Sequence, residues 1–102
     1  MKAFAMQRVD IRWVMTKVAD AVQTLGKPCS ARAVAKHLGA VDANGRPLPA
    51  IAVALELLKL QEEKAISAAV LEKLMRGLTV TALKNLARTI RANHEERLAE
   101  QS

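Results

Sequence analysis

The chain has 102 residues, with 16 Lys and Arg against 10 Asp and Glu, which gives a formal net charge of +6. Aromatic residues make up only 2% of the chain, which excludes RNA-binding sheets that stack bases on several exposed rings. This length corresponds to one domain, and the abundance of Ala and Leu favours helices over a β-sandwich. We therefore expect an all-α fold of about five helices in a single domain over residues 1–102.

The first helix is predicted over residues 7–25, where apolar side chains recur every three or four positions. The expected buried stripe consists of Ile11, Val14, Val18, Val22 and Leu25. Gly26 and Pro28 follow, and neither residue readily continues a helix. Trp13 lies outside the stripe, so it either packs beneath another element or is exposed as a contact residue. We take Trp13 as the candidate residue for a partner interface.

A short second helix is predicted over residues 31–38, because Ser30 is a favourable N-cap and Gly39 a favourable C-terminal stop. Residues 40–49 (AVDANGRPLP) contain an Asn-Gly pair and two prolines without alternating flanks, so we expect a loop rather than a hairpin. The third helix, from residue 48 or 49 to residue 63, is apolar round most of its circumference. Such a helix lies either in the centre of a core or in an oligomer interface.

Two further helices are predicted in the C-terminal third of the chain. The fourth spans residues 68–76 with Ser67 as its N-cap, and the fifth runs from a threonine cap at 79 or 81 to about residue 98. Their expected apolar positions are Val70, Leu71, Leu74 and Met75 in the fourth helix and Val80, Leu83, Leu86, Ala87 and Ile90 in the fifth. The chain then becomes polar, so we expect its last turns to fray or project, with residues 99–102 as a frayed tail.

Residues 30–39 (SARAVAKHLG) resemble the first helix of the helix-turn-helix in many bacterial regulators, with a polar cap, small residues, a Leu and a Gly. Small residues suit a helix that packs on two neighbours, and the Gly suits an abrupt stop before a turn. Residues 54–60 (ALELLKL) and 63–66 (EKAI) are similar to the next helix and the first wing strand of winged-helix DNA-binding domains. The resemblance covers residues 11–66.

The resemblance implies a helix-turn-helix-like core over residues 7–66, followed by the two helices of residues 67–98. It implies a protein of bacterial or phage origin that binds double-stranded DNA as a transcriptional regulator or accessory factor. The third or the fifth helix would supply the contact of a homodimer. A winged domain would place a β-hairpin after residue 66, whereas the residue pattern there predicts a helix. Glu56 and Glu62 would face phosphates unfavourably, so we expect only the start of the third helix to enter a groove.

The positive charge is unevenly distributed. Residues 1–48 hold eight Lys and Arg against three Asp and Glu, whereas the remainder holds eight against seven. A basic region attracts phosphate-rich partners, and the alternative is a solvated face with scattered cations. Arg32 and Lys36 share one helix face, and the fifth helix adds a separate basic stripe. The candidate nucleic-acid-binding residues are Arg8, Arg12, Lys27, Arg32, Lys36, His37, Arg46, Lys84, Arg88 and Arg91.

The sequence contains one cysteine and two histidines, and their spacing is that of neither a metal site nor a catalytic triad. We therefore expect no enzyme activity, no metal, no cofactor and no small-molecule ligand. A single cysteine forms no intramolecular disulfide, and no apolar run is long enough to span a membrane. These features predict a cytoplasmic protein without a membrane partner.

A second interpretation of the same features is a helical protein–protein interaction module, such as an adaptor or inhibitor, that makes no contact with nucleic acid. Trp13, the acids of the third helix and the broad apolar surface of that helix favour this alternative. Both interpretations share one fold, so the arrangement of the basic residues in space must discriminate between them.

Overall fold

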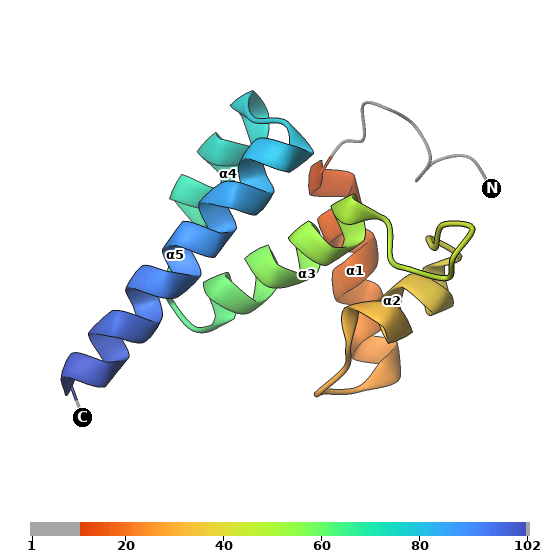
Figure 1. Cartoon of the computed structure of the whole chain (residues 1–102), viewed down its shortest axis with the longest axis horizontal. Coiled ribbons are helices and arrows are strands. Elements are labelled where there is room, and N and C mark those ends of the chain that lie inside the picture. The colour runs from red at the N-terminus through yellow and green to blue at the C-terminus, as the bar shows by residue number, and fades with distance from the viewer. Residues whose placement is uncertain (1–10, 102) are drawn as a thin grey trace. The chain divides into compact units, whose positions relative to one another are not determined.

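The structure is a computed structural model that describes residues 11–101. Within this range the chain forms five α-helices and no β-strand, which confirms the all-α class (Figure 1). The helices are α1 (Ile11–Leu25), α2 (Ala31–Leu38), α3 (Pro49–Glu62), α4 (Ala68–Gly77) and α5 (Val80–Gln101). The predicted start of the first helix at residue 7 and the candidate residue Arg8 lie outside the described residues.

The chain divides into two compact units, and the boundary between them falls inside α3. The N-terminal unit comprises residues 1–55 and the C-terminal unit residues 56–102. The single domain expected over residues 1–102, with its helix-turn-helix-like core over residues 7–66, stays a prediction. Residues 49–55 are uncharged, so the N-terminal unit carries eight Lys and Arg against three Asp and Glu, a net +5, and the C-terminal unit eight against seven, a net +1.

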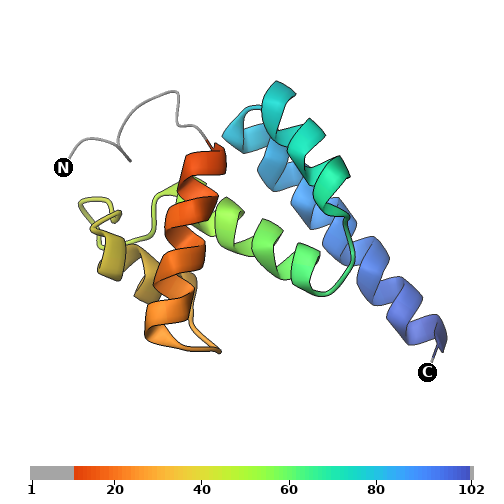
Figure 2. The ribbon, with the colours of Figure 1, turned by 180° about the vertical axis from the view of Figure 1, so that it is seen from behind.

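In the N-terminal unit, α1 and α2 pack side by side (Figures 1 and 2). The buried side chains of α1 are Ile11, Val14, Met15, Val18 and Ala21. The sequence predicts Leu25 in this stripe, but its side chain is 43% exposed. It is the last residue of α1, and Gly26, with φ of 86°, turns the chain away directly after it. Helical periodicity predicts which face of a helix is apolar, but only the part of that face that a neighbouring element covers is buried.

α2 and α3 end in the same way. The backbone N–H of Gly39 donates to the carbonyl of Lys36 at 3.2 Å, and the N–H of Lys64 donates to the carbonyl of Gln61 at 3.0 Å. Both residues are left-handed, with φ of 70° at Gly39 and 63° at Lys64. This conformation costs a residue with a Cβ about 1–2 kcal/mol but costs glycine almost nothing. Lys64 is therefore strained, and Gly39 is not.

The C-terminal unit contains the second half of α3, α4 and α5, and the chain reverses direction between α4 and α5 (Figure 1). Its buried side chains are Leu57, Leu60, Ile66, Leu71, Leu83 and Ala87. Ser67 caps α4 as predicted, because its Oγ accepts a hydrogen bond from the Val70 backbone at 3.2 Å. Val70, one of the expected apolar positions, is exposed, since it lies about 100° round the helix from the buried Leu71.

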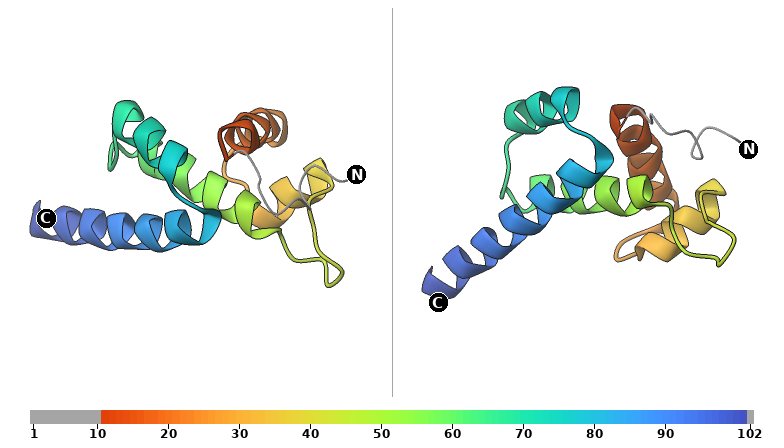
Figure 3. Two further views of the ribbon diagram at one scale, coloured as in Figure 1. Left: turned by 90° about the horizontal axis from the view of Figure 1, so that it is seen from above. Right: turned by 45° about the horizontal axis from the view of Figure 1, so that its top comes forward.

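The fifth helix continues further than predicted, to Gln101. The helix therefore includes residues 99–101 of the segment that was expected to fray, and residue 102 lies outside the described residues. These turns extend beyond α4 in every view, as expected of a projecting end (Figures 1, 2 and 3). Ala, Glu, Arg, Leu and Gln are good helix formers, and extending an existing helix costs far less than starting one.

The segment after α3 contains no wing strand. Ala65 and Ile66 form part of a bend that leads into α4, in agreement with the residue pattern and not with the hairpin that the winged-helix resemblance implied. α3 itself is buried over most of its length, at Ala50, Ile51, Val53, Ala54, Leu55, Leu57 and Leu60. Of the two alternatives for this apolar helix, the structure shows the buried one. None of the helices within residues 11–101 combines the length and the apolar character needed to cross a membrane.

The two left-handed helix ends allow a matched test of backbone strain. Gly39→Ala should lower the free energy of unfolding by about 1 kcal/mol, and the cost would be purely conformational because a Cβ at this position meets no atom within 4 Å. Lys64→Gly should instead raise the free energy of unfolding, by up to about 1 kcal/mol. Urea denaturation followed by circular dichroism measures both. A Lys64→Gly variant that is less stable than the wild type would contradict the assignment of strain to Lys64.

Candidate nucleic-acid interface

α2 presents Arg32 and Lys36 on one exposed face. Residues four apart on a helix differ by about 40° in direction and about 6 Å along the axis, so the two cations are neighbours. Val34 and Ala35 are buried on the other side of the helix. The Oγ of Ser30 accepts a hydrogen bond from the first turn at 3.1 Å, as the sequence predicted for an N-cap. With Ser30 starting the helix and Val34 and Ala35 buried, Arg32 and Lys36 are left on its exposed face.

The loop after α2 is organised by the carboxylate of Asp42. Its Oδ1 accepts hydrogen bonds from the backbone N–H groups of Asn44 at 2.8 Å and Arg46 at 2.9 Å. The N–H of Gly45, whose φ is 77°, donates to the Asp42 carbonyl at 3.0 Å. The Asp42 carboxylate is therefore occupied by backbone donors, while the Arg46 side chain remains exposed.

The two ends of this loop meet directly beyond α2. The N–H of Leu48 donates to the carbonyl of Ala40 at 3.0 Å, and one isolated antiparallel bridge pairs Val41 with Pro47. The segment is thus the predicted loop and not a hairpin with regular strands. Its closure places Arg46 near the C-terminal end of α2.

Five of the predicted residues lie on or beside α2. Lys27 is exposed in the connection from α1, three residues before the N-cap Ser30, and Arg46 follows the other end of the helix. His37 is exposed next to Lys36 in the last turn. We refer to Lys27, Arg32, Lys36, His37 and Arg46 as the α2 cluster.

The outer face of α1 carries a different group. Arg12 is exposed in the first turn of α1, about 20 Å along the helix from its C-terminal end and hence remote from Lys27. Trp13 is 39% exposed, and the ammonium nitrogen of Lys17 lies 5.6 Å from the centre of its ring. Of the two alternatives for Trp13, the structure shows an exposed residue. Arg12 does not belong to the α2 cluster.

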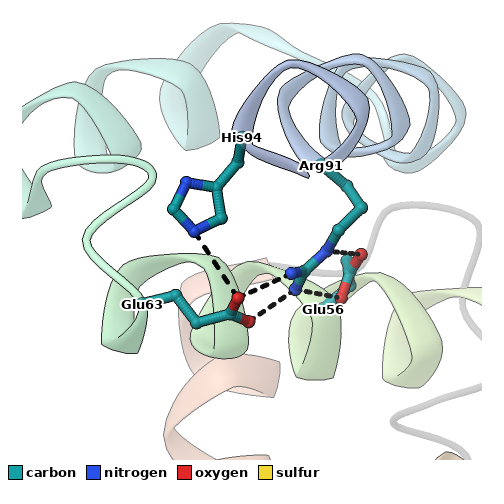
Figure 4. A network of polar contacts seen from close by, with 4 residues as sticks. All are labelled: Glu56, Glu63, Arg91 and His94. Carbon is teal, nitrogen blue, oxygen red and sulfur yellow. Dashed lines mark hydrogen bonds and ion pairs between the residues drawn. The ribbon is translucent and has the colours of Figure 1, made fainter. Parts of the chain in front are cut away.

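The basic stripe of α5 lies in the C-terminal unit, and its three residues differ in their surroundings. Lys84 and Arg88 are exposed. Arg91, in contrast, binds two carboxylates of the same unit (Figure 4). Its Nε and Nη2 donate to Glu56 at 3.2 Å each, and its Nη1 and Nη2 donate to Glu63 at 2.7 and 2.8 Å. The guanidinium thus forms two bidentate pairs that hold α5 against the end of α3.

This network is only partly exposed, with 22% of the Arg91 side chain accessible. The hydrogen bonds from Arg91 lower the pKa of Glu63 below its ordinary value of 4.5, and the two carboxylates raise the pKa of Arg91. The Nε2 of His94 lies 3.6 Å from Glu63, within reach of an ion pair when the imidazole is protonated (Figure 4). Arg91 therefore has a structural role, and its charge is neutralised locally.

The sequence contained a signal for this network that the helical pattern alone did not reveal. Glu56 and Glu63 are seven residues apart on the narrow polar stripe of α3, a spacing that places both carboxylates on one side. Arg91 lies on the flank of the apolar stripe of α5 and reaches both of these carboxylates. The charges of α5 alone do not indicate this pairing, because both partners of Arg91 lie on α3 or directly after it.

Among the described residues, no group of three or more His, Cys, Asp or Glu side chains is arranged to hold a metal ion. Comparison of the chain with protein families, with curated proteins and with solved structures finds no match.

The role of Arg91 can be tested against Arg88, which is exposed on the same helix. Arg91→Ala should lower the free energy of unfolding by about 1–2 kcal/mol, because it removes charge-assisted hydrogen bonds and leaves two carboxylates together. Arg88→Ala should change it by less than about 0.5 kcal/mol. Urea denaturation measures both values, and equal effects would contradict a structural role for Arg91.

The effect of these variants on the free energy of unfolding should depend on pH. The pKa of Glu63 is depressed in the folded protein, so its stabilisation is present above the ordinary value of 4.5 and is lost as the pH falls through the depressed pKa. The loss of unfolding free energy caused by Arg91→Ala should therefore be largest at neutral pH and shrink as the pH falls below that value. The change caused by Arg88→Ala should stay constant with pH.

Proposed function

We propose that the protein binds double-stranded DNA in the cytoplasm through its phosphate backbone, as an accessory factor or transcriptional regulator. One observation carries the proposal: Arg32 and Lys36 are exposed together on one face of α2, in a unit whose net charge is +5. Cations that neutralise phosphates release condensed counterions, and this supplies most of the affinity of sequence-independent DNA binding.

The surroundings of the α2 cluster favour an anionic partner. The acids of the N-terminal unit within the described residues are Asp20 and Asp42. Asp42 accepts two backbone hydrogen bonds that partly compensate its charge, and Asp20 lies on α1. Lys27 and Arg46 lie near the two ends of α2 and extend the positive region along the helix. In helix-turn-helix proteins the helix that α2 resembles crosses the DNA backbone, which is the contact proposed for α2.

A charge-matched pair of variants tests the proposal. Arg32→Ala/Lys36→Ala should weaken binding to a fluorescently labelled duplex by roughly 100-fold at about 50 mM salt, because two phosphate contacts are lost. Lys73→Ala/Arg97→Ala removes the same charge from exposed positions of the C-terminal unit and should change affinity by less than about threefold. Fluorescence anisotropy measures all three proteins. If the wild-type protein binds no duplex at low salt, the proposal is wrong.

A protein–protein interaction module is the second candidate, and the exposure of Trp13 favours it. Exposed tryptophans are frequent anchors of protein interfaces, and the Lys17 ammonium beside the ring gives this surface a positive rim. On this hypothesis the chain forms a dimer through α1, independently of the basic residues of α2.

Sedimentation velocity at increasing concentration tests the second candidate. If Trp13 is a self-association anchor, the wild-type protein should dimerise and Trp13→Ala should be a monomer. The control, Gln23→Ala, changes another exposed residue of α1 and should leave the dimer intact. A wild-type protein that remains monomeric at high concentration would remove this form of the second candidate.

A further inference from the structure

The first half of α3 contains no side chain that could read a base by hydrogen bonding. Residues 49–55 (PAIAVAL) follow the loop that carries Arg46 and belong to the same unit as α2. In helix-turn-helix proteins a helix at this place in the chain enters the major groove. Bases are told apart there chiefly by Arg, Lys, Asn, Gln, Asp, Glu, Ser or Thr side chains, and residues 49–55 include none of these.

Burial restricts this half of α3 further. Ala50, Ile51 and residues 53–55 are buried, which leaves Pro49 and Ala52 as its exposed side chains. The one base contact open to such side chains is van der Waals contact with the methyl group of thymine. A contact of this kind distinguishes one base from another only weakly.

α2 offers cations but few other polar groups. Its sequence (ARAVAKHL) contains no amide, hydroxyl or carboxylate side chain, so the usual partners of adenine and cytosine are absent. Arg32 and Lys36 could contact guanine, but in this unit they are also the groups placed to contact phosphates. The polar chemistry of α2 is therefore that of a helix that binds the DNA backbone.

We infer that the protein holds duplex DNA by its phosphates without reading the base sequence. This inference rests on the proposed function and assigns its ligand class: any DNA duplex, independent of composition. The contacts are the cations of the α2 cluster, Lys27, Arg32, Lys36 and Arg46, and the adjoining half of α3 adds no specificity.

Four phosphate contacts predict a steep dependence on salt. The slope of log K against log salt is about −0.9 per contact, so affinity should fall roughly 150-fold between about 50 and 200 mM salt. Arg32→Ala/Lys36→Ala removes two contacts and should reduce this fall to roughly 12-fold.

The test is an anisotropy titration of the full chain with three labelled duplexes of equal length: A·T-rich, G·C-rich and mixed. Their dissociation constants should agree within about fivefold, the factor that the weakest bidentate base contact, about 1 kcal/mol, would produce. A larger preference for one duplex overturns the inference while leaving DNA binding intact. Failure of every duplex to bind at low salt removes the proposed function itself.

The double variant supplies the second arm of the same experiment. Arg32→Ala/Lys36→Ala should weaken all three duplexes by the same factor, since phosphates are common to all of them. A loss confined to the G·C-rich duplex would show that Arg32 or Lys36 reads guanine and would overturn the inference. A single strand of the mixed sequence that binds as tightly as its duplex would overturn the assignment of duplex DNA as the ligand.

Discussion

The burial of α3 is the constraint on which the other elements depend. This helix is apolar over residues 49–55 and supplies buried side chains to both units. A helix of this kind is stable only when other elements cover it, and burying apolar surface contributes about 25 cal/mol per Å². The first polar residue of α3, Glu56, appears where the C-terminal unit begins, and there Arg91 neutralises it. The first half of α3 thus carries no charged side chain, and in the second half Arg91 compensates the charge of Glu56.

The features that could be predicted from sequence are the local ones. The bounds of α2 follow from Ser30 and Gly39, and the start of α4 follows from Ser67, because caps and left-handed stops depend on residues only a few positions apart. The exposed pair on α2 was predictable for the same reason, since a spacing of four residues is a property of one helix. The places where prediction failed, such as Leu25 and the last turns of α5, depend on where neighbouring elements end or on how far a helix propagates.

The basic stripe of α5 shows why a functional surface is harder to predict than a helix. Lys84, Arg88 and Arg91 are alike in type and spacing, yet Arg88 is exposed and Arg91 donates to two carboxylates. The difference comes from Glu56 and Glu63, which are 35 and 28 residues earlier in the chain. A charge pattern within one segment identifies candidates for an interface, and the distant partners of each side chain decide which candidates remain available.

The burial of Ala50, Ile51 and residues 53–55 has an evolutionary consequence. Substitutions that would give this half of α3 a base-reading side chain must, at most positions, place a polar group in the core, at a cost of several kcal/mol. Pro49 and Ala52 are exposed, and of these two Ala52 lies within the helix at a position that accepts a longer side chain. Such a protein can therefore gain a preference for a DNA sequence through few substitutions. Ala52 and the exposed residues of the 40–48 loop can change, whereas the buried residues of this half of α3 must stay apolar for the protein to fold.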